Sequence, residues 1–140
     1  MPDLKEELHR KLQASRAALL SKLDNLNEYD RRCPMTPTGT NLLGLVKHLA
    51  GLEYGYLGES FGHPAPERMS WIEDGSISQG ADMWAKPDES SEYITSLYRR
   101  ACAHADGVIA ARLGGTWVGG ALARRPAGYD PGRRAHPDGY

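Results

Sequence analysis

Leucines recur at helical spacing over the first stretch of the chain, from Asp3 to Leu26. The apolar positions of this stretch are Leu4, Leu8, Leu12, Leu19, Leu23 and Leu26. Steps of three, four and seven residues place them on one face of a helix and leave charged residues on the other. The pattern predicts a first helix, followed by a connector at residues 27–39 that Pro34 and Pro37 break.

The second predicted helix extends from Thr40 to about Gly58 and is apolar almost all round, with Thr40 or Thr38 as its N-cap. Its main apolar stripe consists of Leu42, Leu45, Val46, Leu49, Leu52 and Tyr56. Much of the opposite side is covered by Leu43, Ala50, Tyr54 and Leu57. A helix of this kind is expected either at the centre of the fold or at a surface shared with a partner subunit.

A long irregular segment, residues 61–87, separates this helix from the third. Its Gly, Pro, Ser and Asp residues follow no sustained period, so the segment is expected to be a functional lid or a series of short helical turns. The side chains expected to hold it onto the helices are Trp71, Ile72, Ile77, Met83 and Trp84.

Helical spacing returns after Asp88, the predicted cap of a third helix that ends near Leu113. The positions on its stripe are Ile94, Leu97, Tyr98, Ala101, Ala105, Val108, Ile109 and Arg112. Residues 114–140 then combine Gly, Pro and Arg without a helical or strand period, and are predicted to be irregular or disordered. The sequence therefore predicts an all-α fold, with a helical domain at residues 1–113 and a tail at residues 114–140.

The composition is that of an ordinary globular chain, with 40% hydrophobic and 25% charged residues. A net charge of -1 gives no general reason to bind nucleic acid or anionic membranes. The chain has no apolar run of membrane-spanning length and begins with a charged segment unlike a signal peptide, so a cytoplasmic location is expected. Cys33 and Cys102 form no metal-binding pair and are expected to be reduced thiols.

His48 is the main candidate for chemistry in the second helix. Gly44, Gly51 and Gly55 lie within about 60° of it on a helical wheel, which leaves room for a ligand pocket or a close helix crossing. The alternative is a histidine at the edge of the core, hydrogen-bonded to a carbonyl, with glycines that only permit close packing. Glu53 lies about 140° away and cannot chelate the same metal, so a structural hydrogen bond or ion pair is expected for it.

The other four histidines carry weaker expectations. His104 faces the same way as the stripe of the third helix and could approach His48, although no local spacing requires this. His9 and His63 are expected at the surface, and His136 falls in the tail. The chain contains no P-loop, HExxH motif, nucleophile elbow or dinucleotide fingerprint.

The chain resembles the DinB-like superfamily over roughly residues 3–113. The resemblance rests on the run TPTGTNLLGLVKHLAGLEYGYLGESFG and on the later segments ADMW, DES and LYRRACAHAD. More narrowly, these segments are similar to the actinobacterial branch of unknown function that includes the so-called mini-circle protein. The resemblance implies an up-down four-helix bundle, often dimeric, that binds a metal through three histidines.

On this resemblance, His48 matches the metal ligand of the second helix, and the metal would be a divalent ion of the zinc, nickel or iron type. Relatives include thiol-dependent transferases and isomerases that use mycothiol or bacillithiol. A thiol cofactor, a small-molecule ligand and a homodimer formed through the bundle helices are therefore implied. The other two metal ligands should come from a His-x-x-x-His pair on a fourth helix, but the chain contains no such pair.

The Gly/Arg/Pro composition of residues 114–140 is typical of a high-GC gene read in the wrong frame. We hypothesise that a frameshift has replaced the fourth helix and truncated the chain. A catalytic metal site needs three protein ligands, so weak metal affinity and loss of activity are expected with His48 alone. The leading hypothesis is a metal-dependent thiol transferase in an inactive form. The alternatives are a non-catalytic, self-associating helical module and a small-ligand-binding protein.

Overall fold

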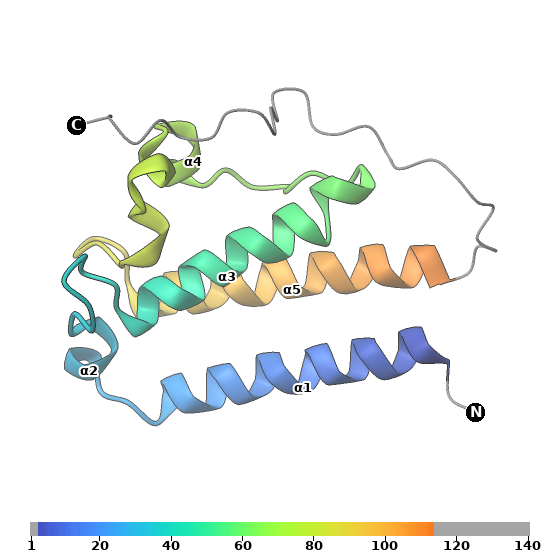
Figure 1. Ribbon diagram of the computed structural model, residues 1–140, viewed down its shortest axis with the longest axis horizontal. Coiled ribbons are helices and arrows are strands. Elements are labelled where there is room, and N and C mark those ends of the chain that lie inside the picture. Colours follow the sequence, from blue (N-terminus) through green and yellow to red (C-terminus); the bar gives the residue numbers. More distant parts are fainter. Residues whose placement is uncertain (1–2, 114–140) are drawn as a thin grey trace.

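The computed structural model describes residues 3–113, and within that range it is all-helical and contains no strand. Three long helices carry the fold: α1 (Leu4–Asp24), α3 (Leu42–Tyr56) and α5 (Ser91–Leu113). α1 runs antiparallel to α3, whereas α3 and α5 run in the same direction because the chain crosses back between them (Figure 1). The all-α fold with three long helices is confirmed, and the predicted tail lies outside the described residues.

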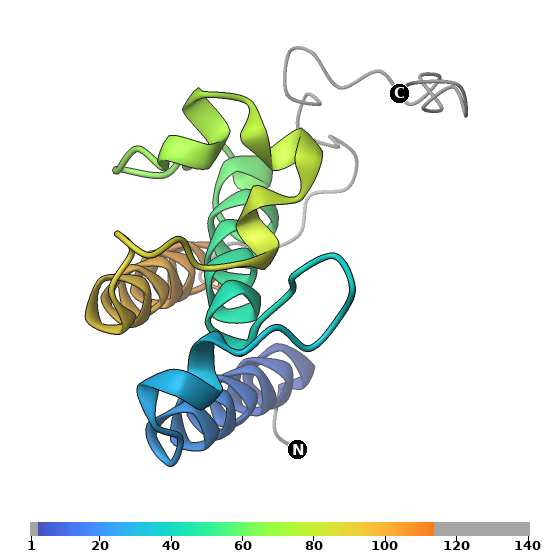
Figure 2. The same cartoon turned by 90° about the vertical axis from the view of Figure 1, so that its left-hand side faces the viewer.

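Short helices occupy the connections between the long ones. The connector after α1 contains α2 (Glu28–Arg32), a helix that the sequence did not predict. The crossover from α3 to α5 contains η1 (Glu59–Phe61), α4 (Ser70–Glu73), η2 (Ser76–Gln79) and η3 (Ala81–Met83). Of the two expectations for this crossover, short helical turns are confirmed. In the end-on view of Figure 2, the crossover covers α3 on the side away from α1.

The core lies mainly between α3 and α5, which pack against each other more extensively than any other pair of elements. The predicted stripe of α5 is confirmed at its buried positions: Ile94, Leu97, Tyr98, Ala101, Ala105 and Val108. Ile109 is half-buried, and the side chain of Arg112 lies outside the description.

The face of α3 that enters the core differs from the predicted one. The buried apolar positions are Leu43, Val46, Ala50 and Tyr54, so Val46 alone of the predicted main stripe is fully buried. Leu42, Leu45, Leu49 and Leu52 are half-buried, and Tyr56 is 70% exposed. Periodicity could not select the correct face because both sides of this helix are apolar. The face of α3 that is buried agrees with the positions of Lys47 and Glu53. These two residues flank the buried apolar positions, and each pairs with a charged residue far along the chain, Glu89 and Arg16.

The stripe predicted for α1 is wrong at its N-terminal end. Leu23 is buried and joins the core, but Leu4 and Leu8 are 71% and 58% exposed. α1 does not approach α3 or α5 as closely as those two helices approach each other. Apolar packing therefore anchors only the C-terminal half of α1.

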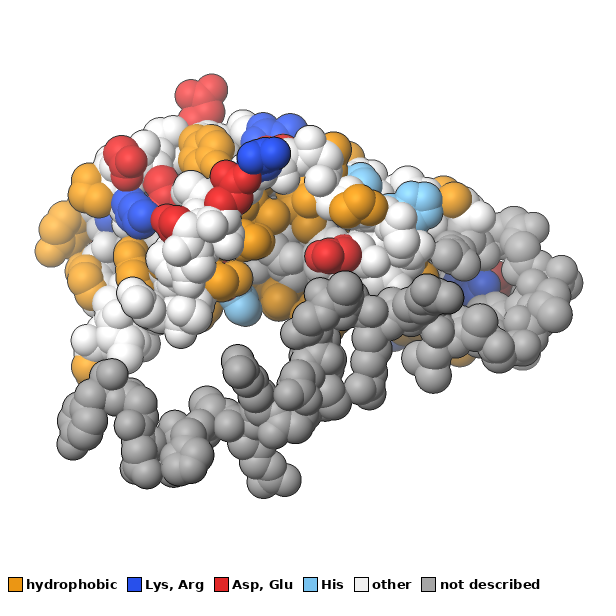
Figure 3. Space-filling view, turned by 90° about the horizontal axis from the view of Figure 1, so that it is seen from above, with side chains coloured by type: hydrophobic (Ala, Val, Ile, Leu, Met, Phe, Trp, Pro, Cys, Tyr) orange, Lys and Arg blue, Asp and Glu red, His pale blue; other side chains and the backbone are white. Residues whose placement is uncertain are grey.

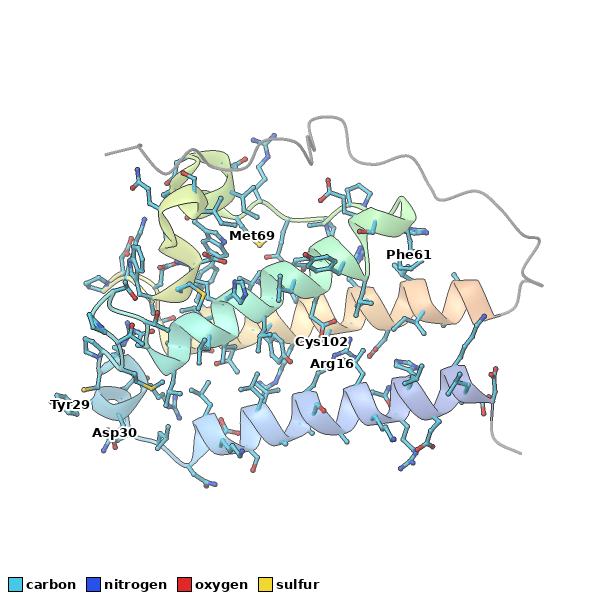
Figure 4. The ribbon with its side chains drawn as sticks, viewed as in Figure 1. Arg16, Tyr29, Asp30, Phe61, Met69 and Cys102 are labelled. Carbon is cyan, nitrogen blue, oxygen red and sulfur yellow. The ribbon has the colours of Figure 1, made fainter. Side chains whose placement is uncertain are left out.

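The residues that anchor the crossover also differ in part from those predicted. Trp71 is 1% exposed, and Met83 and Trp84 are half-buried, as expected for anchors. Ile72 and Ile77 are instead exposed, and Met69, which was not predicted, is buried. Figure 4 shows Met69 between the crossover and α3. The crossover thus rests on Met69, Trp71 and Ala81, while Ile72 and Ile77 between them are exposed.

Asn41 caps α3, so the predicted caps Thr40 and Thr38 are wrong. Its Oδ1 atom accepts hydrogen bonds from the amides of Gly44 (2.7 Å) and Ala85 (3.2 Å), and its Nδ2 donates to the carbonyl of Arg32 (3.2 Å). A side-chain amide can donate and accept at once, which a capping threonine cannot do over the same span. Asn41 therefore starts the helix and ties α2 and the crossover to it.

The predicted cap of the third long helix, Asp88, is also wrong. α5 begins at Ser91, and the hydroxyl of Ser90 accepts the amide hydrogen of Tyr93 at 3.0 Å. The carboxylate of the preceding residue, Glu89, is turned inward and accepts the backbone N–H of Lys86. This turn over residues 86–89 delays the start of the helix.

Candidate functional site

His48 lies on α3 opposite the short helix η3 of the crossover. Its Nδ1 atom is 2.6 Å from Oδ2 of Asp82, whose carboxylate is mostly buried. The imidazole is partly exposed, and among residues 3–113 its Nε2 atom makes no hydrogen bond. A histidine held at Nδ1 by a carboxylate keeps Nε2 free to bind a metal or to exchange a proton. The alternative hypothesis, a histidine hydrogen-bonded to a backbone carbonyl, is therefore wrong about the partner, which is a carboxylate.

The three glycines around His48 fall into two groups. A Cβ atom at Gly44 would lie 2.0 Å from the carbonyl oxygen of Met83, because the backbone of η3 packs directly on this glycine. A Cβ atom at Gly51 or Gly55 would meet nothing within 4 Å among the described residues. Gly44 therefore serves close packing, and only Gly51 and Gly55 leave open space along this side of α3.

The described residues supply one ligand position for a divalent metal and do not complete a site. The free Nε2 of His48, oriented through Asp82, has the chemistry of a metal ligand. Within residues 3–113, however, no group of three His, Cys, Asp or Glu side chains is placed to hold a metal ion. Outside that range the sequence offers one further histidine, His136. A metal at His48 would therefore need ligands from residues 114–140 or from another chain.

His104 does not join His48. Its Nε2 atom is 2.9 Å from the backbone carbonyl of His63, and its ring lies 5.5 Å from that of Tyr54. These contacts hold the start of the crossover against α3 and α5. His63 itself is exposed, as predicted.

His9 is not the surface residue that the sequence predicted. Its Nε2 atom is 2.7 Å from Oδ1 of Asp106, and its side chain is only 19% exposed. Burial alone would raise the pKa of Asp106, but hydrogen bonds from His9 and Arg16 outweigh it and lower that pKa. His9 thus belongs to a polar network that joins α1 to α5.

Glu53 was expected to make a structural hydrogen bond or ion pair, and its partner in the structure is Arg16 of α1. The guanidinium donates from Nε (2.8 Å) and from one terminal nitrogen (2.6 Å) to the two carboxylate oxygens, and both side chains are less than 10% exposed. The other terminal nitrogen donates to Asp106 at 2.6 Å. Burial opposes the charge of Arg16, but these hydrogen bonds outweigh it and raise its pKa. The structural role predicted for Glu53 is confirmed.

Cys102 lies beside this ion pair, in the space between α1 and α5 (Figure 4). Burial, together with the nearby charge of Glu53, raises the pKa of its thiol to about 11. At neutral pH the thiol is therefore protonated, which makes it a poor nucleophile. Cys102 and Cys33 are both free, as predicted, and Cys102 is not suited to supply a reactive thiolate.

Sequence reasoning missed Asp82, the hydrogen-bond partner of His48, and Lys47, its neighbour on α3. Asp82 lies 34 positions further along the chain, so no local spacing could pair it with His48. Lys47 is completely buried although it is charged. Its position in an otherwise apolar helix is the one signal that could have identified it, since a buried ammonium requires specific partners.

Among residues 3–113, neither surface charge nor a hollow marks a second candidate site for chemistry. On the face seen in Figure 3, acidic and basic side chains lie among one another and do not separate by sign. Two open hollows near the start of α5 are both lined by Glu28 and Ser91, and neither includes His48. Within the described part of the chain, no helix combines the length and the apolar character needed to cross a membrane.

Comparison with known proteins places the chain beside a described family. A family model described as mycothiol-S-transferase is similar to residues 7–127, which include all three long helices except the first residues of α1. No curated protein and no solved structure matches the chain.

Proposed function

Because the chain belongs to the mycothiol-S-transferase family, we propose that it serves thiol chemistry on a small molecule, with His48 as a ligand of a divalent metal. The hydrogen bond between His48 Nδ1 and Asp82 carries this proposal. It resembles the outer-shell contact that orients metal-binding histidines in other proteins and increases their basicity. Family membership supports a thiol as the reacting cofactor. The open space beside Gly51 and Gly55 would give a small molecule access to this side of α3.

The chain's own residues have two tasks in this proposal, and a bound metal would have a third. Asp82 fixes the proton of the imidazole on Nδ1, so that Nε2 presents its lone pair. The crossover, packed on Gly44, closes one side of His48 against solvent. A bound divalent metal would lower the pKa of a coordinated thiol or water and so provide a nucleophile at neutral pH.

Metal binding should depend on His48 and not on other exposed histidines. With its remaining ligands supplied by residues 114–140 or by another chain, a metal at His48 should stay on purified protein dialysed against excess Zn²⁺ and then against buffer, and His48→Ala should lose it. Asp82→Asn should weaken the binding by roughly 10- to 100-fold, the usual effect of removing an outer-shell partner. The measurement is metal content by mass spectrometry, with affinity from competition against a chelator.

His63→Ala is the matched control, because His63 is exposed and its hydrogen bonds, to Gly58 and His104, are made by backbone atoms. It should retain the metal of the unmodified protein. Metal content near zero in both the unmodified protein and His48→Ala would remove the metal from the proposal. Stoichiometric metal in the unmodified protein would make His136 the next residue to replace, since His104 already binds the carbonyl of His63.

A second candidate function, a self-associating helical module, is favoured by one observation. The leucine-rich face of α3 is incompletely covered by the described residues, with Leu45, Leu49 and Leu52 half-buried and Tyr56 exposed. Apolar faces of this kind are typical of subunit interfaces. On this reading, a second copy of the chain would cover the face.

Self-association is tested by the molar mass of the protein in solution. A dimer is expected by light scattering after size-exclusion chromatography, and Leu52→Glu should convert it to a monomer by placing a charge in the interface. Tyr29→Glu is the control, because Tyr29 is 75% exposed on α2, away from this face. If the unmodified protein is monomeric at all concentrations, self-association is excluded as its function.

A further inference from the structure

Lys47, the neighbour of His48 on α3, is the most completely enclosed charged side chain near the candidate site, with an exposed fraction of 0%. Its ammonium donates to the carbonyl of Ala81 (2.8 Å), to the carbonyl of Trp84 (3.3 Å) and to Oε1 of Glu89 (2.9 Å). It also lies 4.3 Å from the centre of the Trp71 ring, a cation–π distance. A buried ammonium is tolerated only with such partners, so these contacts specify one position of the surrounding backbone.

All of these partners belong to the segment that follows α3, and two of them flank Asp82. Ala81 and Asp82 are neighbours in η3, and Trp84 follows directly after that helix. Lys47 therefore holds the backbone on both sides of the residue that binds His48. Asn41 also anchors this segment, because its backbone N–H donates to the carbonyl of Met83 at 3.3 Å.

The geometry points to a specific function for this arrangement. Lys47 and His48 are about 100° apart around α3, so one lysine and one histidine of the same helix face η3 from adjacent positions. We propose that Lys47 is a positioning residue for His48. Its ammonium fixes η3 so that Asp82 accepts the Nδ1 proton of the imidazole and Nε2 remains free.

This inference deepens the proposed function, since the orientation of Nε2 matters most if His48 binds a metal. It makes a claim that can be tested without metal, however, because it concerns the tautomer of the imidazole. The hydrogen bond at one ring nitrogen sets which nitrogen carries the proton. Without an acceptor at Nδ1, the neutral imidazole favours the proton on Nε2.

The test is the ring ¹⁵N spectrum of His48 in metal-free protein, at a pH where the ring is neutral. The unmodified protein is expected to show the Nδ1–H tautomer, and Asp82→Asn should shift it towards Nε2–H. Lys47→Met keeps an apolar side chain of similar length but leaves the buried Glu89 carboxylate without its ion-pair partner. The decisive variant is therefore Lys47→Met combined with Glu89→Gln, which removes both charges and is expected to preserve the fold.

The double variant should shift His48 in the same direction as Asp82→Asn, and should weaken metal binding by roughly 10- to 100-fold, as expected for loss of outer-shell support. Lys11→Met, at an exposed lysine of α1, should change neither. An unchanged Nδ1–H signal in the folded double variant would overturn the positioning role, whatever metal is bound. A shifted tautomer in a protein that binds no metal would retain the positioning role and refute only the proposed metal site.

Discussion

Replacing Glu53 with alanine is expected to lower the free energy of unfolding by about 3–5 kcal/mol, the usual cost of leaving one member of a buried ion pair without its partner. Arg16 and Glu53 form a two-point ion pair with both side chains less than 10% exposed. In the variant, the guanidinium would retain only Asp106, whose side chain is 35% exposed. Urea denaturation followed by circular dichroism measures the loss.

The matched control is Glu7→Ala, which removes an ion pair of similar geometry at the surface. Arg10 is 71% exposed in that pair, so its loss should cost at most about 1 kcal/mol. Replacing both members of the buried pair, as Arg16→Met with Glu53→Leu, should recover much of the stability, because no uncompensated charge remains. A loss below 1 kcal/mol for Glu53→Ala would show that α1 does not depend on this pair.

The ion pair explains how α1 stays on the bundle although its apolar contacts are few. Leu4 and Leu8 are exposed, and only the end near Leu23 enters the core. Near the N-terminus, His9 binds Asp106 of α5. Past the middle of α1, Arg16 binds both Asp106 of α5 and Glu53 of α3. Arg16 and Cys102 accordingly face the space between the helices in Figure 4. Polar contacts therefore set the position of α1 where packing does not.

Helical periodicity was sufficient to predict the long helices and the buried stripe of α5. The stripe of α5 could be identified because polar residues occupy its other side, so only one face could be buried. On α3 the same reasoning selected the wrong face, because nearly every position is apolar. The two charged residues, Lys47 and Glu53, mark the correct orientation, but their partners lie 42 and 37 positions away in the sequence. Long-range ion pairs leave no local pattern.

The candidate site was predictable only in part for the same reason. His48 was identified from its glycine-rich surroundings and from the family resemblance, and membership of a mycothiol-S-transferase family confirms the DinB-like assignment. Its partner Asp82 comes from a crossover whose path depends on Lys47, Asn41 and the packing on Gly44. No periodicity specifies such a path. The frameshift hypothesis concerns residues 114–140, outside the described part of the chain, and remains a prediction.

Gly44→Ala is expected to destabilise the protein by about 3 kcal/mol, at the upper end of the cost of overpacking. The added methyl group would lie 2.0 Å from the carbonyl oxygen of Met83 and 2.4 Å from the amide nitrogen of Trp84. Both atoms belong to backbone that cannot rotate away, so η3 would have to move as a unit. Because Asp82 precedes this peptide, the movement should also lengthen its hydrogen bond to His48.

Gly51→Ala is the opposite case on the same helix. No described atom lies within 4 Å of the added methyl group, and alanine favours the helix over glycine by up to about 1 kcal/mol. Thermal and urea unfolding of the two variants should therefore give changes of opposite sign. Destabilisation by Gly51→Ala would show that another part of the protein, or a second copy, occupies the space beside His48. Equal effects from both variants would contradict the close packing of η3 on Gly44, and with it the contact that brings Asp82 to the histidine.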